Sequence, residues 1–368
     1  MLTRKVAIRG VGAYLPGERI PTLEIEDYLG PIPGCDVSKY CRIIEKFAGI
    51  RYRYYALEKF TGRLLEDSAS LAARAAQTAL DRAGVAARDI DLVVTATSTP
   101  PYLRPGLAKE VRLRLGNAGC ATYDLWGACT GVQQAMTLAT GALRAGMFRN
   151  ALLVGVELPS TTGRSENYAH DRIKRQDILL RAALGDGAGA LVLSQADDWV
   201  AGDGVLYTLS GTEGDASSAF HREAGGSSAP LNNETFAMGL HHWQHDFERL
   251  RREGRAYFVE IVRRTLERAR MSIDEVDFIV PAAANFGYFR ADEYLKGAGP
   301  EERRLWHRIV ERIYTNFSDV GNIPSAAIYV ALNALYEAGR LRRDAVVLLP
   351  SIEGATWGWG ATLLRWNG

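Results

Sequence analysis

The stretch Trp126-Gly-Ala-Cys-Thr-Gly-Val-Gln-Gln-Ala-Met136 decides the fold expected for this chain. Small or apolar residues follow Cys129 at most positions of a helical pattern as far as Leu143, which predicts a buried helix rather than a surface one. Gly127 and Gly131 keep the turn around the cysteine free of bulk, so a substrate could approach the sulfur closely.

A thiol at the start of a helix can be reactive or inert. Unpaired backbone N–H groups and the positive end of the helix dipole favour the thiolate form. A buried cysteine without chemistry is the commoner state of a free thiol. The local sequence leaves both interpretations open for Cys129, and the rest of the chain has to decide between them.

Composition excludes several classes of protein. A hydrophobic content of 47% and a charged content of 24% over 368 residues are typical of a globular protein with a large core. The net charge of +1 argues against nucleic acid or an anionic membrane as the main partner. The four cysteines form no CxxC pair, strand-like residues begin at once, and no apolar run approaches the roughly 20 residues of a membrane span. We therefore expect a cytoplasmic α/β protein.

The order of elements is strand and helix in alternation. An amphipathic helix is expected over residues 68–83, and buried strands over 89–97 and 151–157. Residues 210–235 are rich in Gly, Ser and Asn, which predicts a long loop, and a helix follows at 256–270.

The second half of the chain repeats the first. Residues 79–94 (ALDRAGVAARDIDLVV) match residues 265–280 (TLERARMSIDEVDFIV) at an offset of 186. The Ala-Gly pair that ends the helix after Cys129 recurs at Ala338-Gly339, an offset of 193. Two similar units imply a pseudo-twofold molecule with halves at residues 1–196 and 197–368. Adding 193 to 129 gives Asn322, so we expect Cys129 and Asn322 to lie near one shared axis.

These residues resemble the thiolase superfamily, specifically β-ketoacyl-acyl carrier protein synthase III and its relatives in fatty-acid, polyketide and related secondary metabolism. The segments that carry the resemblance run almost the whole length: Gly10–Pro16, Asp91–Pro101, Gly127–Gly131, Gly185–Ala190, Gly321–Asn322 and Thr356–Arg365. The resemblance implies a thiolase-like five-layer αβαβα fold, a homodimer, and a tunnel that admits a phosphopantetheine arm to the cysteine.

The resemblance also implies roles for individual residues. Cys129 would take an acyl group from a thioester, and backbone N–H groups at Cys129 and near Glu353–Gly354 would hold the oxyanion. Asn322 would help to bind a malonyl thioester while it loses carbon dioxide, and Asn285 would order the site through packing. No metal and no cofactor is implied beyond the phosphopantetheine thioesters, which are substrates.

One departure affects the chemistry. The family's histidine lies in a Pro-His-x-x-Asn segment, and the corresponding segment here, Val280–Asn285, has Ala282 in its place. Loss of a general acid–base group typically costs about 10²–10⁴-fold in rate. Three explanations stay open: an alanine engineered to stall the enzyme, a natural acyltransferase that needs no carbanion, or a degenerate partner subunit. Glu353 stands where relatives often have glycine; it either replaces the missing base or points away and contributes only its N–H group.

The expected partner depends on where charged residues are present and where they are missing. Ile43 and Phe47 stand where coenzyme A-dependent relatives carry a Trp and an Arg, which favours an acyl carrier protein over coenzyme A as the thioester donor. Arg249, Arg252 and Arg255 either meet an acidic carrier protein or form an ordinary solvated face. A separate group, His241, His242 and His245, lacks a cysteine or paired carboxylate to complete a ligand set, so no metal site is expected.

The leading hypothesis is an acyltransferase of the ketosynthase III type. It would load an acyl or β-ketoacyl chain on Cys129 and join it to a second carrier-bound chain by a Claisen-type condensation. The alternatives are transfer of the acyl group to an alcohol or amine, and a non-catalytic subunit of a heterodimeric synthase. Chain length, acceptor and pathway do not follow from the sequence.

Overall fold

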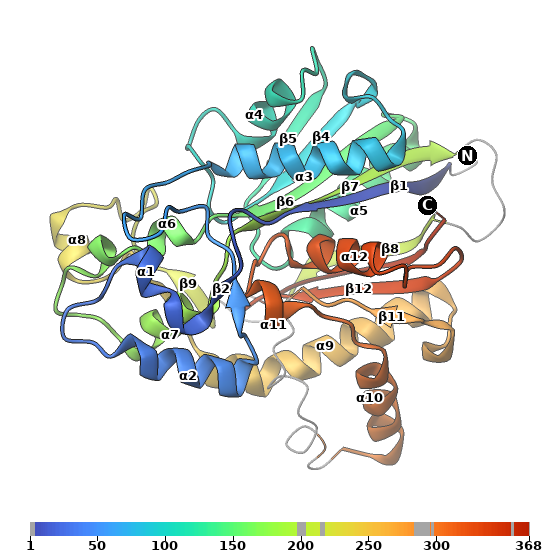
Figure 1. Ribbon diagram of the computed structural model, residues 1–368. Coiled ribbons are helices and arrows are strands. Elements are labelled where there is room, and N and C mark those ends of the chain that lie inside the picture. Colours follow the sequence, from blue (N-terminus) through green and yellow to red (C-terminus); the bar gives the residue numbers. More distant parts are fainter. Residues whose placement is uncertain are drawn as a thin grey trace.

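Two mixed β-sheets with helices between and outside them form the molecule (Figure 1). The computed structural model describes residues 4–196, 204–213, 218–282, 295, 298–354 and 357–367. In the described part of the chain, no helix combines the length and the apolar character needed to cross a bilayer.

The first sheet comes entirely from the N-terminal half. Its strand order is β1-β7-β6-β4-β5, with β4 parallel to β5 and β6, and β7 antiparallel to β6 and β1. The strands are β1 (Lys5–Tyr14), β4 (Leu92–Ala96), β5 (Ala121–Leu125), β6 (Asn150–Glu157) and β7 (Gly187–Ala196). The expected strands at 89–97 and 151–157 are therefore β4 and β6.

The second sheet repeats this arrangement. Its order is β11-β12-β13-β8, with β11 parallel to β12, and β13 antiparallel to β12 and β8. The strands are β8 (Gly204–Thr212), β11 (Phe278–Ile279), β12 (Val346–Ile352) and β13 (Gly358–Arg365). A single parallel bridge between Ile279 and Ile313 stands where the first sheet has β5. The matching order supports a division of the chain after residue 196, which stays a prediction.

Helices complete five layers. The central layer holds α5 (Gly131–Ala145), which contacts strands of both sheets, and α12 (Ala327–Glu337), which contacts β1 and β7; both helices share one buried cluster with strands of the two sheets. The outer layers are α3 (Ser68–Ala83) with α4 (Leu107–Arg114) on the first sheet, and α9 (Phe247–Ala269) with α10 (Pro300–Arg312) on the second. The chain thus has the thiolase-like αβαβα fold, and the helix that follows Cys129 is buried as its pattern predicts.

Helix α3 shows how the sequence sets this packing. Asp67 caps the helix by accepting the Ser70 N–H at 2.7 Å, and Gly84 ends it in the left-handed conformation. Its alanine face lies so close to β1 that a Cβ on Gly10 or Gly12 would collide with the helix backbone. The predicted bounds 68–83 are those observed, because residues of types that favour helix ends stand on both sides of the helix.

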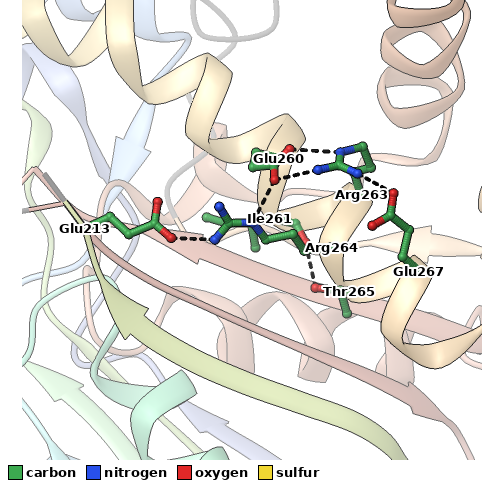
Figure 2. A network of polar contacts seen from close by, with 7 residues as sticks. All are labelled: Glu213, Glu260, Ile261, Arg263, Arg264, Thr265 and Glu267. Atoms are coloured by element: carbon green, nitrogen blue, oxygen red, sulfur yellow. Dashed lines mark hydrogen bonds and ion pairs between the residues drawn. The ribbon is translucent and has the colours of Figure 1, made fainter.

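Ion pairs hold α9 against the second sheet (Figure 2). Glu260 accepts two hydrogen bonds from Arg263 at 2.7 and 2.9 Å and one from Arg264 at 2.7 Å. Arg264 also pairs with Glu213, just after β8, and Arg263 pairs with Glu267. Exposed pairs of this kind stabilise a fold by only about 0.2–1 kcal/mol each. The network orients α9, while the buried apolar face of the helix supplies the stability.

Shorter elements connect the strands and helices of the five layers. They are β2 (Ile20–Pro21), η1 (Thr22–Glu24), α1 (Glu26–Leu29), α2 (Val37–Ala48), β3 (Tyr52–Arg53), η2 (Ala87–Asp89), α6 (Ser160–Gly163), η3 (Ser165–Tyr168), α7 (Arg175–Ala183), β9 (Phe220–Arg222), α8 (Asn233–Ala237), β10 (Trp243–His245), η4 (Ile273–Glu275) and α11 (Phe317–Val320). The expected loop at 210–235 therefore contains the end of β8, β9 and the start of α8. The prediction was wrong there because pairing with β13 and β10 outweighs the local turn composition.

Candidate active site

Cys129 lies in the turn between β5 and α5, one residue before the N-cap residue Thr130. It is half-buried and packs against the central cluster that contains Val132 and Ala282. The Ser351 hydroxyl donates to the Cys129 carbonyl, so the end of β12 is fixed to the cysteine turn. The nucleophile candidate of the first half therefore contacts an element of the second half.

The turn that contains Asn322 also meets the cysteine turn. Ser325 Oγ lies 2.9 Å from the Gly127 carbonyl oxygen and 3.1 Å from that of Ala128. The Asn322 backbone is held by the Ala183 carbonyl and the Gly185 N–H, both at 2.9 Å. Its side-chain Oδ1 is buried and has no hydrogen-bond partner among the described residues. The two halves converge here, and the part of Asn322 in a reaction stays a prediction.

Ala282 follows β11 and is 2% exposed. Its N–H donates to the Pro350 carbonyl at 3.2 Å, and its methyl group belongs to the same apolar cluster that Cys129 contacts. A methyl group can neither donate a hydrogen bond nor accept a proton, so this position supplies no acid–base group. Asn285 lies outside the described residues.

Glu353 turns its carboxylate toward the start of α5. Its Oε2 accepts the Thr130 hydroxyl at 2.6 Å and the Thr130 N–H at 3.4 Å. Its own N–H donates to the Gly358 carbonyl at 2.8 Å. The interpretation that Glu353 points away and offers only its N–H group is therefore wrong, because that N–H is used in the strand hairpin. The Gly354 carbonyl accepts the Ala219 N–H at 2.9 Å, and an oxyanion role for the Gly354 N–H stays a prediction.

The Cys129 thiol is not activated as its helix position suggests. Burial, then the nearby carboxylates of Glu353 and Glu157, raise the pKa of Cys129 to about 12. The stabilisation of the thiolate expected from the helix position is opposed here, because α5 begins only at Gly131 and the preceding Thr130 N–H lies 3.4 Å from the Glu353 carboxylate.

Two further carboxylates lie behind the site. Glu157 ends β6 and accepts hydrogen bonds from Ser98, Thr99 and Ser325, and burial raises its pKa. Asp186 accepts from Ala56 N–H and Ser160, yet burial raises its pKa to about 7. Sequence reasoning missed both as site residues. The signal was an acidic residue in or beside an otherwise apolar strand, which buried β-strands rarely contain.

Comparisons with known proteins cover the whole site. Residues 123–214 match the family model described as 3-oxoacyl-[acyl-carrier-protein (ACP)] synthase III, and residues 266–366 match its C-terminal counterpart. The chain is 31% identical to the β-ketoacyl-[acyl-carrier-protein] synthase III of Symbiobacterium thermophilum, with 100% of both chains covered. The chain belongs to the synthase III family.

Other synthase III proteins give the same picture. The Clostridioides difficile enzyme is 28% identical, with 100% of both chains covered. The crystal structure of 3-oxoacyl-(acyl carrier protein) synthase III from Pseudomonas aeruginosa superimposes with a TM-score of 0.78 at 27% identity, with 99% of each chain covered. This chain is therefore a synthase III-like enzyme of the acyl-transferring, condensing type.

The arginines expected to meet a carrier protein differ in exposure. Arg252 has a side chain 70% exposed, and it pairs with Glu253 at 2.9 Å. The Arg249 side chain is 19% exposed and pairs with the same carboxylate at 3.0 Å. Arg255 is buried at 4%, so the prediction that it meets a surface partner is wrong. It lies on the inner face of α9, which the local charge pattern does not show.

Proposed function

We propose that this chain transfers acyl groups through a thioester on Cys129 and joins them to a second carrier-protein-bound chain by condensation, in polyketide or related secondary metabolism. The observation that carries this proposal is the meeting of the Cys129 turn, the Asn322 turn and the Glu353 carboxylate in a member of the synthase III family. No metal or cofactor takes part in the proposed transfer.

The first step, acylation of the enzyme, uses Cys129 and Glu353. Cys129 sulfur attacks the thioester carbonyl, its proton passes to Glu353, and the phosphopantetheine thiol leaves as the carbon–sulfur bond breaks. Glu353 then returns the proton to the leaving sulfur. A buried carboxyl group suits this exchange, because burial raises its pKa and so brings that pKa closer to neutral pH than the pKa of an exposed carboxyl group.

The second step decides between two kinds of product. Condensation needs a carbanion, which the family stabilises with a histidine and an asparagine, and here only Asn322 of that pair is present. The presence of Ala282 favours a second candidate, transfer of the acyl group to an alcohol or amine, which needs no carbanion. A third, a non-catalytic subunit, would leave Cys129 without an adduct.

We propose an acyl carrier protein as the thioester donor, with coenzyme A as the alternative. On α2, neither Ile43 nor Phe47 can pair with a phosphate, and Phe47 is 55% exposed. Arg252 on α9 is the most exposed of the three arginines considered and supplies a positive charge for an acidic carrier.

We also propose a homodimer through the edge of the first sheet. β5 stands at the end of the strand order, so one side of its backbone has no strand partner within the described residues. Tyr123 in this strand and Trp126 just after it are 54% and 69% exposed. Light scattering is expected to give twice the chain mass, and Tyr123→Lys with Trp126→Lys is expected to give the monomer mass. Leu23→Lys, a control at a side chain 49% exposed on η1, should stay dimeric. A monomeric wild-type protein at micromolar concentration would contradict the proposal.

Mass spectrometry of the intact protein tests the function. Incubation with acyl carrier thioesters is expected to add one acyl group, and Cys129→Ala is expected to add none. The acylated protein is then supplied with a malonyl carrier thioester, an alcohol or an amine. A product with a new carbon–carbon bond supports condensation, while an ester or amide supports the second candidate. Absence of any adduct on folded wild-type protein would overturn both.

A further inference from the structure

Three histidines form a cluster, although only two of them are neighbours in the sequence. His170 follows η3, and His241 with His242 precedes β10. One ring nitrogen from each of the three residues lies within 4.8 Å of those of the other two. His245, which the sequence grouped with His241 and His242, instead packs its ring against Phe247 at 3.8 Å. The third member of the cluster comes from a segment that spacing alone could not connect.

The hydrogen bonds define which ring nitrogens carry lone pairs. His241 Nε2 lies 2.7 Å from the Asn167 carbonyl oxygen, which only accepts, so this nitrogen carries the proton. His241 Nδ1 therefore has a lone pair, and it is buried without a partner in the described part of the chain. A ring N–H donated to a carbonyl, with the other nitrogen free to coordinate, is the usual second-shell arrangement of a metal-bound histidine.

The other two histidines form a pair. His170 Nδ1 accepts the Arg172 N–H at 3.1 Å, so His170 Nε2 carries its proton and donates to His242 Nε2 at 2.8 Å. His242 Nε2 is thus the second ring nitrogen of the cluster that carries a lone pair. Binding of a metal ion at His170 Nε2 moves its proton to Nδ1 and breaks the exposed contact with Arg172.

Packing and charge favour neutral, oriented rings. Phe236 stacks on His241 with ring centroids 4.5 Å apart, and Tyr168 packs on His242 at 4.6 Å. Burial lowers the pKa of all three histidines, which leaves the neutral form that metals require. Arg222 and Lys174 add positive charge near His242, which weakens binding of a cation, and Asp171 near His170 opposes this.

There is also space beside the rings. A cavity of about 40 Å³ is lined by His241, His242 and Tyr168, which is enough for a water molecule. A water molecule in this cavity would be the fourth ligand of an ion held by the three imidazoles.

We propose that His170, His241 and His242 bind a divalent transition-metal ion, with Zn²⁺ as the best match to three imidazoles and a water. The ion would tie the segment after η3 to the segment before β10. It would be a structural ion, separate from the acyl-transfer chemistry at Cys129, so the proposal does not rest on the proposed function.

Titration with the metal alone tests this site. Metal-free protein is expected to bind one Zn²⁺ by calorimetry, and one Co²⁺ with the strong visible absorption of tetrahedral coordination. His241→Ala and His242→Ala are each expected to weaken binding by at least about 10-fold. Zn²⁺ should also raise the melting temperature of wild-type protein and leave that of His241→Ala unchanged.

His307→Ala, at an exposed histidine of α10, is the matched control and should bind like wild type. His170 lies in an exposed segment, so His170→Gln should fold even where a substitution of the buried His241 or His242 does not. The proposal is overturned if folded wild-type protein binds no Zn²⁺ at 100-fold excess, or if the variants of the cluster bind as tightly as His307→Ala.

Discussion

Ala282→His is expected to increase the rate of carbon–carbon bond formation by about 10²–10⁴-fold, which is the usual contribution of a general acid–base group. Ala282 stands at the position of the family's histidine and belongs to the cluster against which Cys129 packs, so we expect an imidazole placed there to take part in the second step. The measurement is the rate of condensed product from acylated protein and a malonyl carrier thioester. Acylation of Cys129 itself should change less, because Glu353 is available for that proton.

The variant adds volume at a residue 2% exposed, and such overpacking costs about 1–3 kcal/mol of folding free energy. Ala282→Asn is the matched control, since it adds a polar side chain of similar reach without a base. Thermal unfolding and the acyl adduct on Cys129 show whether each variant is folded. If the folded histidine variant forms no more condensed product than the asparagine variant, the acyl group is destined for an alcohol or amine.

Glu353→Gln is expected to slow acylation of Cys129 by about 10²–10⁴-fold, because the amide cannot take the thiol proton. Burial raises the pKa of Glu353, and only its ionised form is a base. Wild-type acylation should therefore rise with pH through that raised pKa and then level off. The glutamine variant should lack this rise. The measurement is the initial rate of adduct formation by intact mass between pH 5 and 9.

Thr130→Val tests whether Glu353 acts as a base or only caps α5. The Thr130 hydroxyl donates to Glu353 Oε2 at 2.6 Å and lowers the carboxyl pKa, so its loss should move the rise in rate to higher pH without removing it. The raised pKa also means that protonated Glu353 stabilises the fold at low pH and that this contribution is lost as pH rises through the folded pKa. A glutamine variant that keeps the wild-type pH profile would show that Glu353 only caps α5.

Much of the fold could be predicted from the sequence because its signals are local or repeated. Caps at Asp67 and Gly84 define α3, and the duplicated segments place equivalent elements in two halves. The offset of 193 pointed from Cys129 to Asn322, and their turns are in contact through Ser325. The raised pKa of the thiol could not be predicted, because it depends on burial and on Glu353, which is distant in sequence and follows β12.

By itself, the sequence determined the alternating α/β elements, the two similar halves and the position of the cysteine, because hydrophobic periodicity and internal repetition are properties of the chain alone. The αβαβα architecture and the family followed from the resemblance of its motifs to a known family. Only the tertiary structure decided the electrostatics. The carboxylates of Glu353 and Glu157 raise the pKa of Cys129, and His170 joins His241 and His242, through contacts between segments far apart in the chain. Burial and distance set those interactions, and neither is encoded by residue spacing.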